Sequence, residues 1–66
     1  MELVIIKSKD RYIRVKEDGY HEVGIDKASV FPMDQLSLVR EHKKALNRLG
    51  FTHIALKKLV LTEKDL

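Results

Sequence analysis

The chain contains no cysteine and no tryptophan, and only one proline and three glycines among its 66 residues. The lack of cysteine excludes disulfides, thiolate nucleophiles and cysteine-ligated zinc, which often support so short a chain. The first residues lack the basic and apolar regions of a secretory signal, and no apolar run approaches the roughly 18 residues of a membrane span. We therefore expect a soluble cytoplasmic protein with no membrane partner.

Patterns typical of catalysis and metal binding are also lacking. Glu17 and Asp18 are adjacent carboxylates, but they occupy a predicted turn, and no serine lies in a Gly-x-Ser-x-Gly elbow. None of the histidines has the His-x-x-x-His spacing that places two metal ligands on one helix face. The three histidines are His21, His42 and His53. We expect a non-catalytic protein without a metal or a cofactor.

The length predicts one small domain covering residues 1–66. A chain of this size removes only about 60% of its unfolded surface from water, so its core is small and a large substrate cleft is disfavoured. Thirteen basic and ten acidic side chains give a net charge of +3, which permits contact with polyanions without requiring it.

Three strands are predicted in the first half of the chain. Glu2 to Lys7 is apolar on both alternating faces and predicts an interior strand. Apolar and polar residues alternate from Arg11 to Lys16, as in a strand with one solvent-exposed face, so Ile13 and Val15 are expected to face inward. The Asp18-Gly19 pair predicts a type I′ hairpin turn. The third strand is then Tyr20 to Ile25, with Val23 and Ile25 inward and Tyr20 and Glu22 outward.

A helix from about Met33 to Leu49 follows. Pro32 suits a helix start because its missing N–H needs no partner there, and Gly50 suits the left-handed residue just past the end, after which Phe51 folds back. The apolar residues recur at helical spacing and define one buried stripe, which includes His42.

The segment Thr52 to Thr62 has two interpretations. Ile54 and Leu56 fit a strand, and a bulge near Lys57 and Lys58 would bring Leu59 into phase. One helical stripe would also contain Ala55, Leu56, Leu59 and Val60, so residues 55–66 could form a second helix. The β-branched content favours the strand.

The sequence thus predicts an α+β fold of order β-β-β-α-β. A three- or four-stranded, mostly antiparallel sheet carries the helix on one face, with the last strand beside the first. The predicted core comprises Leu3, Ile5, Ile13, Val15, Val23, Phe31, Leu36, Val39, Leu46, Leu49 and Ile54.

Two surfaces are candidates for binding. The sheet face away from the helix would present Val4, Ile6, Tyr12 and Arg14, an apolar patch typical of a protein interface, including one between two copies of the chain. The helix presents Arg40, Lys44 and Arg48 at successive turns. This row is typical of a solvated face, but it also suits nucleic-acid phosphates or an acidic protein.

The Ala28-x-x-Phe31 element, with a helix ending Leu49-Gly50-Phe51, resembles small uncharacterised proteins of bacteriophages and prophages of Gram-positive bacteria. The resemblance implies a compact accessory factor that binds a host protein or nucleic acid. We therefore expect a non-catalytic protein-interaction module that binds a protein partner or itself, through the uncovered sheet face or an exposed strand edge. The alternative is a nucleic-acid-binding protein that uses the basic helix face.

Overall fold

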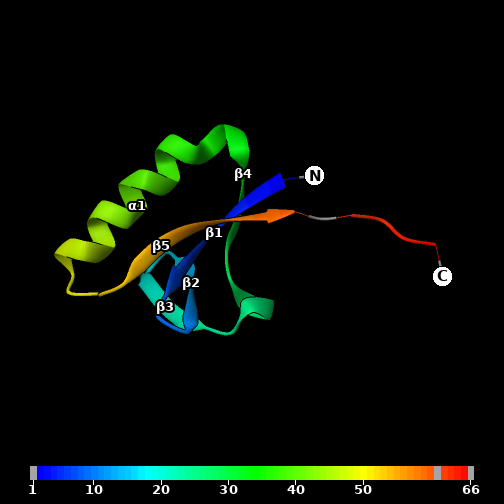
Figure 1. The fold of residues 1–66 in the computed structure, drawn as a ribbon. Coiled ribbons are helices and arrows are strands. Elements are labelled where there is room, and N and C mark those ends of the chain that lie inside the picture. The colour runs from blue at the N-terminus through cyan, green and yellow to red at the C-terminus, as the bar shows by residue number, and fades with distance from the viewer. Residues whose placement is uncertain (1, 61, 66) are drawn as a thin grey trace.

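The computed structural model describes residues 2–60 and 62–65, in which five strands form one sheet and an α-helix packs against it (Figure 1). The predicted α+β fold class is confirmed. In chain order the elements are β1 (Glu2–Ser8), β2 (Arg11–Lys16), β3 (Gly19–Val23), β4 (Val30–Pro32), α1 (Leu36–Arg48) and β5 (Ile54–Val60). Short 3-10 turns precede β4, at Ile25–Lys27, and α1, at Met33–Gln35.

β1 lies at the centre of the sheet. One of its edges pairs with β5 over the full length of both strands, and its other edge is shared between β2 and β4. β3 pairs with β2, and every pairing is antiparallel. The predicted placement of the last strand beside the first is confirmed. The short β4 was not predicted, because its final residue, Pro32, was interpreted as a helix entry.

The helix ends where the sequence predicts. Gly50 follows the C-cap residue Leu49 and has a φ of 96°, a left-handed conformation that costs glycine little. The Gly50 N–H donates to the Asn47 carbonyl at 3.2 Å, and the Phe51 N–H donates to the Leu46 carbonyl at 3.1 Å. This pair of bonds is the Schellman arrangement, and Phe51 then packs against the core.

The core lies between the sheet and α1, but β1 contributes the opposite face from the one predicted. Val4 and Ile6 are 3% and 0% exposed and belong to the core cluster. Leu3 and Ile5 face the other way. Because β1 is apolar on both faces, its alternation alone could not choose between them. The buried members of the cluster are Val4, Ile6, Ile13, Val39 and Leu46.

β3 is also rotated relative to the prediction. The turn residues are Glu17 and Asp18, one position earlier than predicted, and the positive φ of 134° falls on Gly19. Tyr20 therefore pairs with Val15 on the helix side, and Val23 lies on the outer side. There the Tyr20 hydroxyl lies 2.7 Å from His42 Nδ1, and His42 also packs beside Phe31.

Two further predictions were wrong. Leu49 is 65% exposed, because the chain turns at Gly50 and Phe51, rather than Leu49, covers the core. β5 is a strand, as favoured, but it keeps one register with β1 throughout, so there is no bulge at Lys57 and Lys58. Leu61, within the predicted strand, lies outside the described residues.

The Tyr20 hydroxyl gives a test of the inward position of β3. Tyr20→Phe should lower the free energy of unfolding by about 1 kcal/mol, because it removes a half-buried hydrogen bond and leaves His42 Nδ1 unpaired. Urea denaturation followed by circular dichroism measures the change. The matched control is Tyr12→Phe, whose ring lies 5.7 Å from Lys7 Nζ on the outer face and should cost less than about 0.5 kcal/mol. Equal effects of the two substitutions would contradict the observed register.

Candidate functional site

The structure divides the predicted interaction face. Val4 and Ile6 lie beneath α1 and are unavailable to a partner, which corrects the prediction that they line the uncovered face. Tyr12 and Arg14 do lie on the outer side of β2, where Arg14 Nη1 donates to the Lys27 carbonyl at 3.1 Å. The structure therefore does not bring the four residues together on one surface.

The actual outer face presents different residues from those predicted. From β1 it contains Leu3, Ile5 and Lys7 in place of Val4 and Ile6. Ile5 is only 4% exposed, and its neighbours across the ladders, Val30 and Lys57, flank it on the same face. The centre of this face is thus already shielded within the chain.

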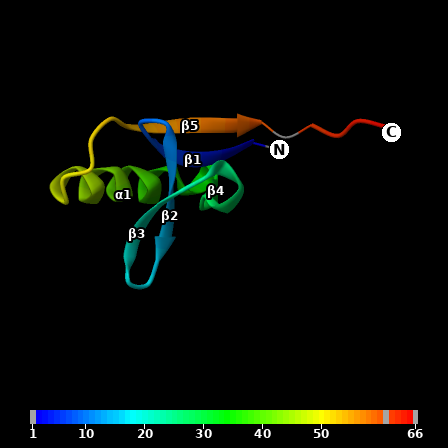
Figure 2. The ribbon, with the colours of Figure 1, turned by 90° about the horizontal axis from the view of Figure 1, so that it is seen from below.

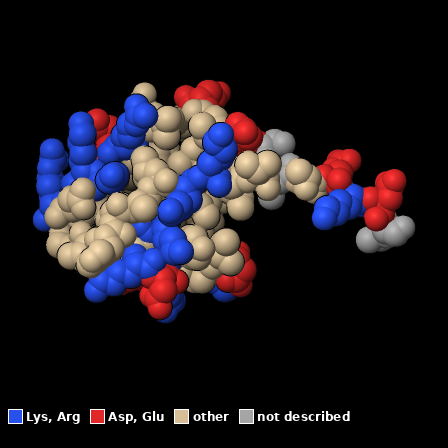
Figure 3. All heavy atoms as spheres, viewed as in Figure 1, with Lys and Arg blue, Asp and Glu red and all other residues tan. Residues whose placement is uncertain are grey.

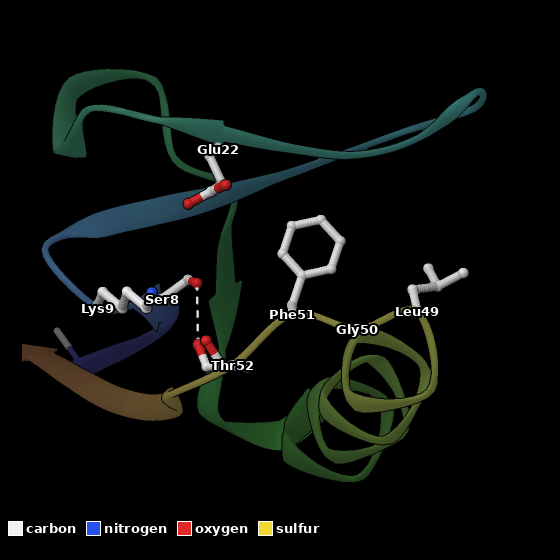
Figure 4. A pocket seen from close by; sticks show the side chains of 7 residues that line it. All are labelled: Ser8, Lys9, Glu22, Leu49, Gly50, Phe51 and Thr52. Atoms are coloured by element: carbon white, nitrogen blue, oxygen red, sulfur yellow. Dashed lines mark hydrogen bonds between the residues drawn. The ribbon is translucent and has the colours of Figure 1, made fainter.

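A hollow of about 330 Å³ lies where the α1–β5 loop meets the strands (Figure 4). Ser8 is buried, and its hydroxyl donates to the Thr52 carbonyl at 3.3 Å. The Glu22 side chain extends from β3 into the same hollow. The lining residues are Ser8, Lys9, Glu22, Leu49, Gly50, Phe51 and Thr52. With one carboxylate and no histidine in this lining, the hollow does not assemble a nucleophile, a general base and an orienting group.

The histidines are separated in space as well as in sequence. His42 pairs with Tyr20, whereas His21 Nε2 lies 3.0 Å from Asp18 Oδ1 at the exposed hairpin end. This hydrogen bond lowers the pKa of the Asp18 carboxyl, which keeps it charged at the turn. Residues 2–60 and 62–65 contain no group of three histidine, aspartate or glutamate side chains placed to hold a metal ion.

The predicted basic row on α1 is exposed, but its members point in different directions. Each residue turns an α-helix by about 100°, so His42 and Arg40 lie on opposite flanks of the side that carries the buried Val39. His42 contacts Tyr20 and Phe31, which belong to strands on the far side of β1 from β5. Arg40, about 100° from Val39, and Lys43, about 40° from it, therefore lie on the flank that faces β5. Lys44 and Arg48, about 140° and 180° from Val39, point away from the sheet.

β5 has one unpaired edge. Its pairing within the described residues is to β1 alone, and Figure 2 shows it as the outermost strand on its side of the sheet, opposite β3. The Lys9 N–H donates to the His53 carbonyl at 3.3 Å, and Lys9 and His53 continue the register of this ladder. Because bonded and non-bonded pairs alternate in an antiparallel ladder, residues 55, 57 and 59 direct their backbone groups to β1. The remaining β5 residues direct theirs to the open edge.

The β1–β2 hairpin shows independently which β5 residues direct their backbone groups to the open edge. Its two-residue turn closes on Ser8 and Arg11, which in such a hairpin exchange backbone hydrogen bonds. The backbone N–H and C=O of Ser8 therefore point toward β2. Ile54 is the neighbour of Ser8 across the β1–β5 ladder, so the backbone groups of Ile54 point away from β1. The free backbone groups of β5 belong to Ile54, Leu56, Lys58 and Val60.

Cations surround this open edge. Figure 1 shows β5 in front of β1, so Figure 3 looks toward the open side, where lysine and arginine side chains gather over α1 and β5 while acidic side chains lie mainly at the rim. Lys57 and Lys58 are exposed on β5 itself, and Lys58 Nζ lies 3.5 Å from Glu2 Oε2. The sequence analysis named an exposed strand edge as one route for binding but did not assign it to β5. The available signal was the adjacent lysine pair inside an apolar strand, a device that natural edge strands use.

None of the described helices has both the length and the apolar character required to traverse a bilayer. Comparisons of the chain with protein-family models, with curated proteins and with solved structures found no match. The case for a function therefore depends on the open edge of β5 and its surroundings.

The backbone alternation along β5 predicts an alternating pattern of amide hydrogen exchange. Leu56 and Lys58 should exchange at least about tenfold faster than Ala55 and Lys57, because only the latter amides are bonded to β1. Hydrogen–deuterium exchange followed by NMR measures each amide separately. Equal protection of both sets would mean that the edge is already covered and would contradict an open β5.

Proposed function

We propose that this chain is a non-catalytic protein-interaction module that accepts an extended segment of a partner as an additional strand beside β5. The observation that carries the proposal is the open edge, where the backbone groups of alternate β5 residues face away from β1. Such an edge binds an extended chain through main-chain hydrogen bonds, and pockets for alternate side chains give specificity. The seven residues of β5 match the length of a typical recognition strand.

The edge is a better candidate than the outer sheet face. Outer-face binding needs a patch of exposed apolar side chains, but Val4 and Ile6 are in the core and Ile5 is shielded, and the well-exposed Val30 lies on the short strand β4. Edge binding needs only backbone groups in an extended conformation, and β1 already holds β5 in that conformation along its whole length. The resemblance to small phage and prophage proteins supports an accessory role that works by binding.

A proline at an open-edge position tests the proposal. Lys58→Pro removes an N–H that faces the open edge and no bond of the β1 ladder, so the domain should still fold. The probe is a capped seven-residue peptide in which glutamine alternates with valine or threonine, called the neutral peptide. Lys58→Pro should weaken its binding about fivefold or more, because one main-chain hydrogen bond is lost. NMR titration of the Leu56 amide measures the affinity.

Lys58→Ala is the matched control, because it removes the same charge and the same exposed ion pair with Glu2 but keeps the N–H. Its affinity for the neutral peptide should stay within about twofold of the unmodified chain. Equal binding by the proline and alanine variants, or no binding of the peptide to the unmodified chain, would refute strand addition.

A second candidate function is nucleic-acid binding through the basic face of α1. It is favoured by the exposure of Arg40, Lys44 and Arg48, although Lys44 Nζ also lies 3.4 Å from Glu41 Oε1. Such cations bind phosphates with a strong dependence on salt concentration.

Charge reversal tests this candidate. Replacing Arg40, Lys44 and Arg48 by glutamate changes the formal net charge from +3 to −3, since each reversal subtracts two charges. If nucleic acid is the ligand, retention on single-stranded DNA and on heparin should be lost at low salt. Reversal of Lys16, Lys27 and Lys64 gives the same net charge away from the helix and should retain binding. Equal retention of both variants would eliminate the basic face as a nucleic-acid site.

A further inference from the structure

The chemistry around the open edge narrows the kind of segment that it can accept. Side chains of β5 alternate between the helix side, where Leu56 and Lys58 pair with Ile6 and Val4, and the outer side, where Ala55 and Leu59 lie around Lys57. An added strand would lie about 4.8 Å beyond β5 and would continue the same alternation. Half of its side chains would therefore face the α1 flank and half would face outward.

The helix side of the edge is cationic. Lys58 contributes one charge from β5, and Arg40 and Lys43 contribute two from the flank of α1 that faces this strand. Glu2, whose carboxylate lies 3.5 Å from Lys58 Nζ, is about half exposed, so this ion pair is of the weak surface kind. An incoming carboxylate would find an excess of positive charge here.

The outer side of the edge is more apolar. Ala55 and Leu59 are half-buried, and across the β1 ladder they pair with Lys7 and Leu3. Apolar side chains of an added strand would cover Ala55 and Leu59 on this side, in the way that cross-strand pairs stabilise a sheet. The single outer cation of β5, Lys57, lies between them.

A second copy of the chain is a poor occupant. The two-fold arrangement that pairs all seven residues of β5 with those of another β5 places Lys57 opposite its own copy. Lys57 directs its backbone groups to β1, so this contact would be a non-bonded pair, whose side chains approach most closely. Like charges directly opposite each other destabilise a strand pair. The lysines thus oppose self-pairing, and they attract a strand of opposite charge.

Taking the proposed strand addition as its basis, we propose that the partner segment is an acidic extended peptide in which carboxylates alternate with apolar or small residues. The carboxylates lie on the helix side, toward Lys58 and the α1 flank, and the apolar residues cover Ala55 and Leu59 on the outer side. The charge on the edge thereby selects a hetero-partner over a second copy.

The test compares the neutral peptide with an acidic peptide that has glutamate in place of each glutamine. At low salt the acidic peptide should bind at least about tenfold more tightly, because charge-assisted contacts are added to the same backbone bonds. In 1 M salt, where the screening length is about 3 Å, the two affinities should converge. NMR titration of the Leu56 amide measures both.

Variants on α1 locate the effect. The double substitution Arg40→Gln with Lys43→Gln should weaken binding of the acidic peptide about fivefold and leave the neutral peptide unchanged. Lys16→Gln with Lys27→Gln removes the same charge from the end of β2 and from the turn before β4, and should change neither affinity. A loss common to both double variants would reflect net charge alone and would overturn the inference.

The outcomes separate this inference from strand addition itself. Equal affinity for the two peptides, with both lost in Lys58→Pro, would overturn the acidic partner and leave the proposed function standing. Failure of both peptides to bind would overturn both. A third outcome would also overturn the inference, in favour of a nucleic-acid ligand. In that outcome a single-stranded DNA oligonucleotide binds the α1 flank and displaces the acidic peptide only there, while the Leu56 amide is unperturbed.

Discussion

The fold depends on the pairing of β1 along both of its edges. A strand that is apolar on both faces is suited to the centre of a sheet, and β1 is paired at both edges, by β5 on one and by β2 with β4 on the other. α1 then covers the face that carries Val4 and Ile6. The same arrangement leaves β5 outermost on its side of the sheet. The open edge of β5 is therefore a direct consequence of the pairing of β1 with its neighbours.

The charges of the chain are arranged consistently with that edge. Lysines on an edge strand discourage uncontrolled pairing of exposed backbone groups, and Lys57 and Lys58 occupy the middle of β5. Arg40 and Lys43 add positive charge from α1 on the same side, where Figure 3 shows few acidic side chains. In the proposed interaction Lys57 opposes self-association, while Lys58 and the α1 flank select an acidic strand.

The parts of the fold with a local signal could be predicted from the sequence. Gly50 marked the helix end, and the alternation of Ile13 and Val15 fixed the inward side of β2. The face of β1 could not be predicted, because both of its faces are apolar. A turn one residue earlier than Asp18-Gly19 reversed β3, since strand side chains alternate with a period of two. The open edge of β5 is a property of the strand order, and only its two lysines hinted at it.

The central claim is that a partner backbone lies directly against the open edge of β5. Intermolecular nuclear Overhauser effects between the acidic peptide and the isotope-labelled chain test it most directly. The account predicts contacts from the peptide backbone protons to those of β5 along Ile54–Val60. Contacts restricted to Tyr12 and Arg14 on the outer face, or to the side chains of α1, would contradict it.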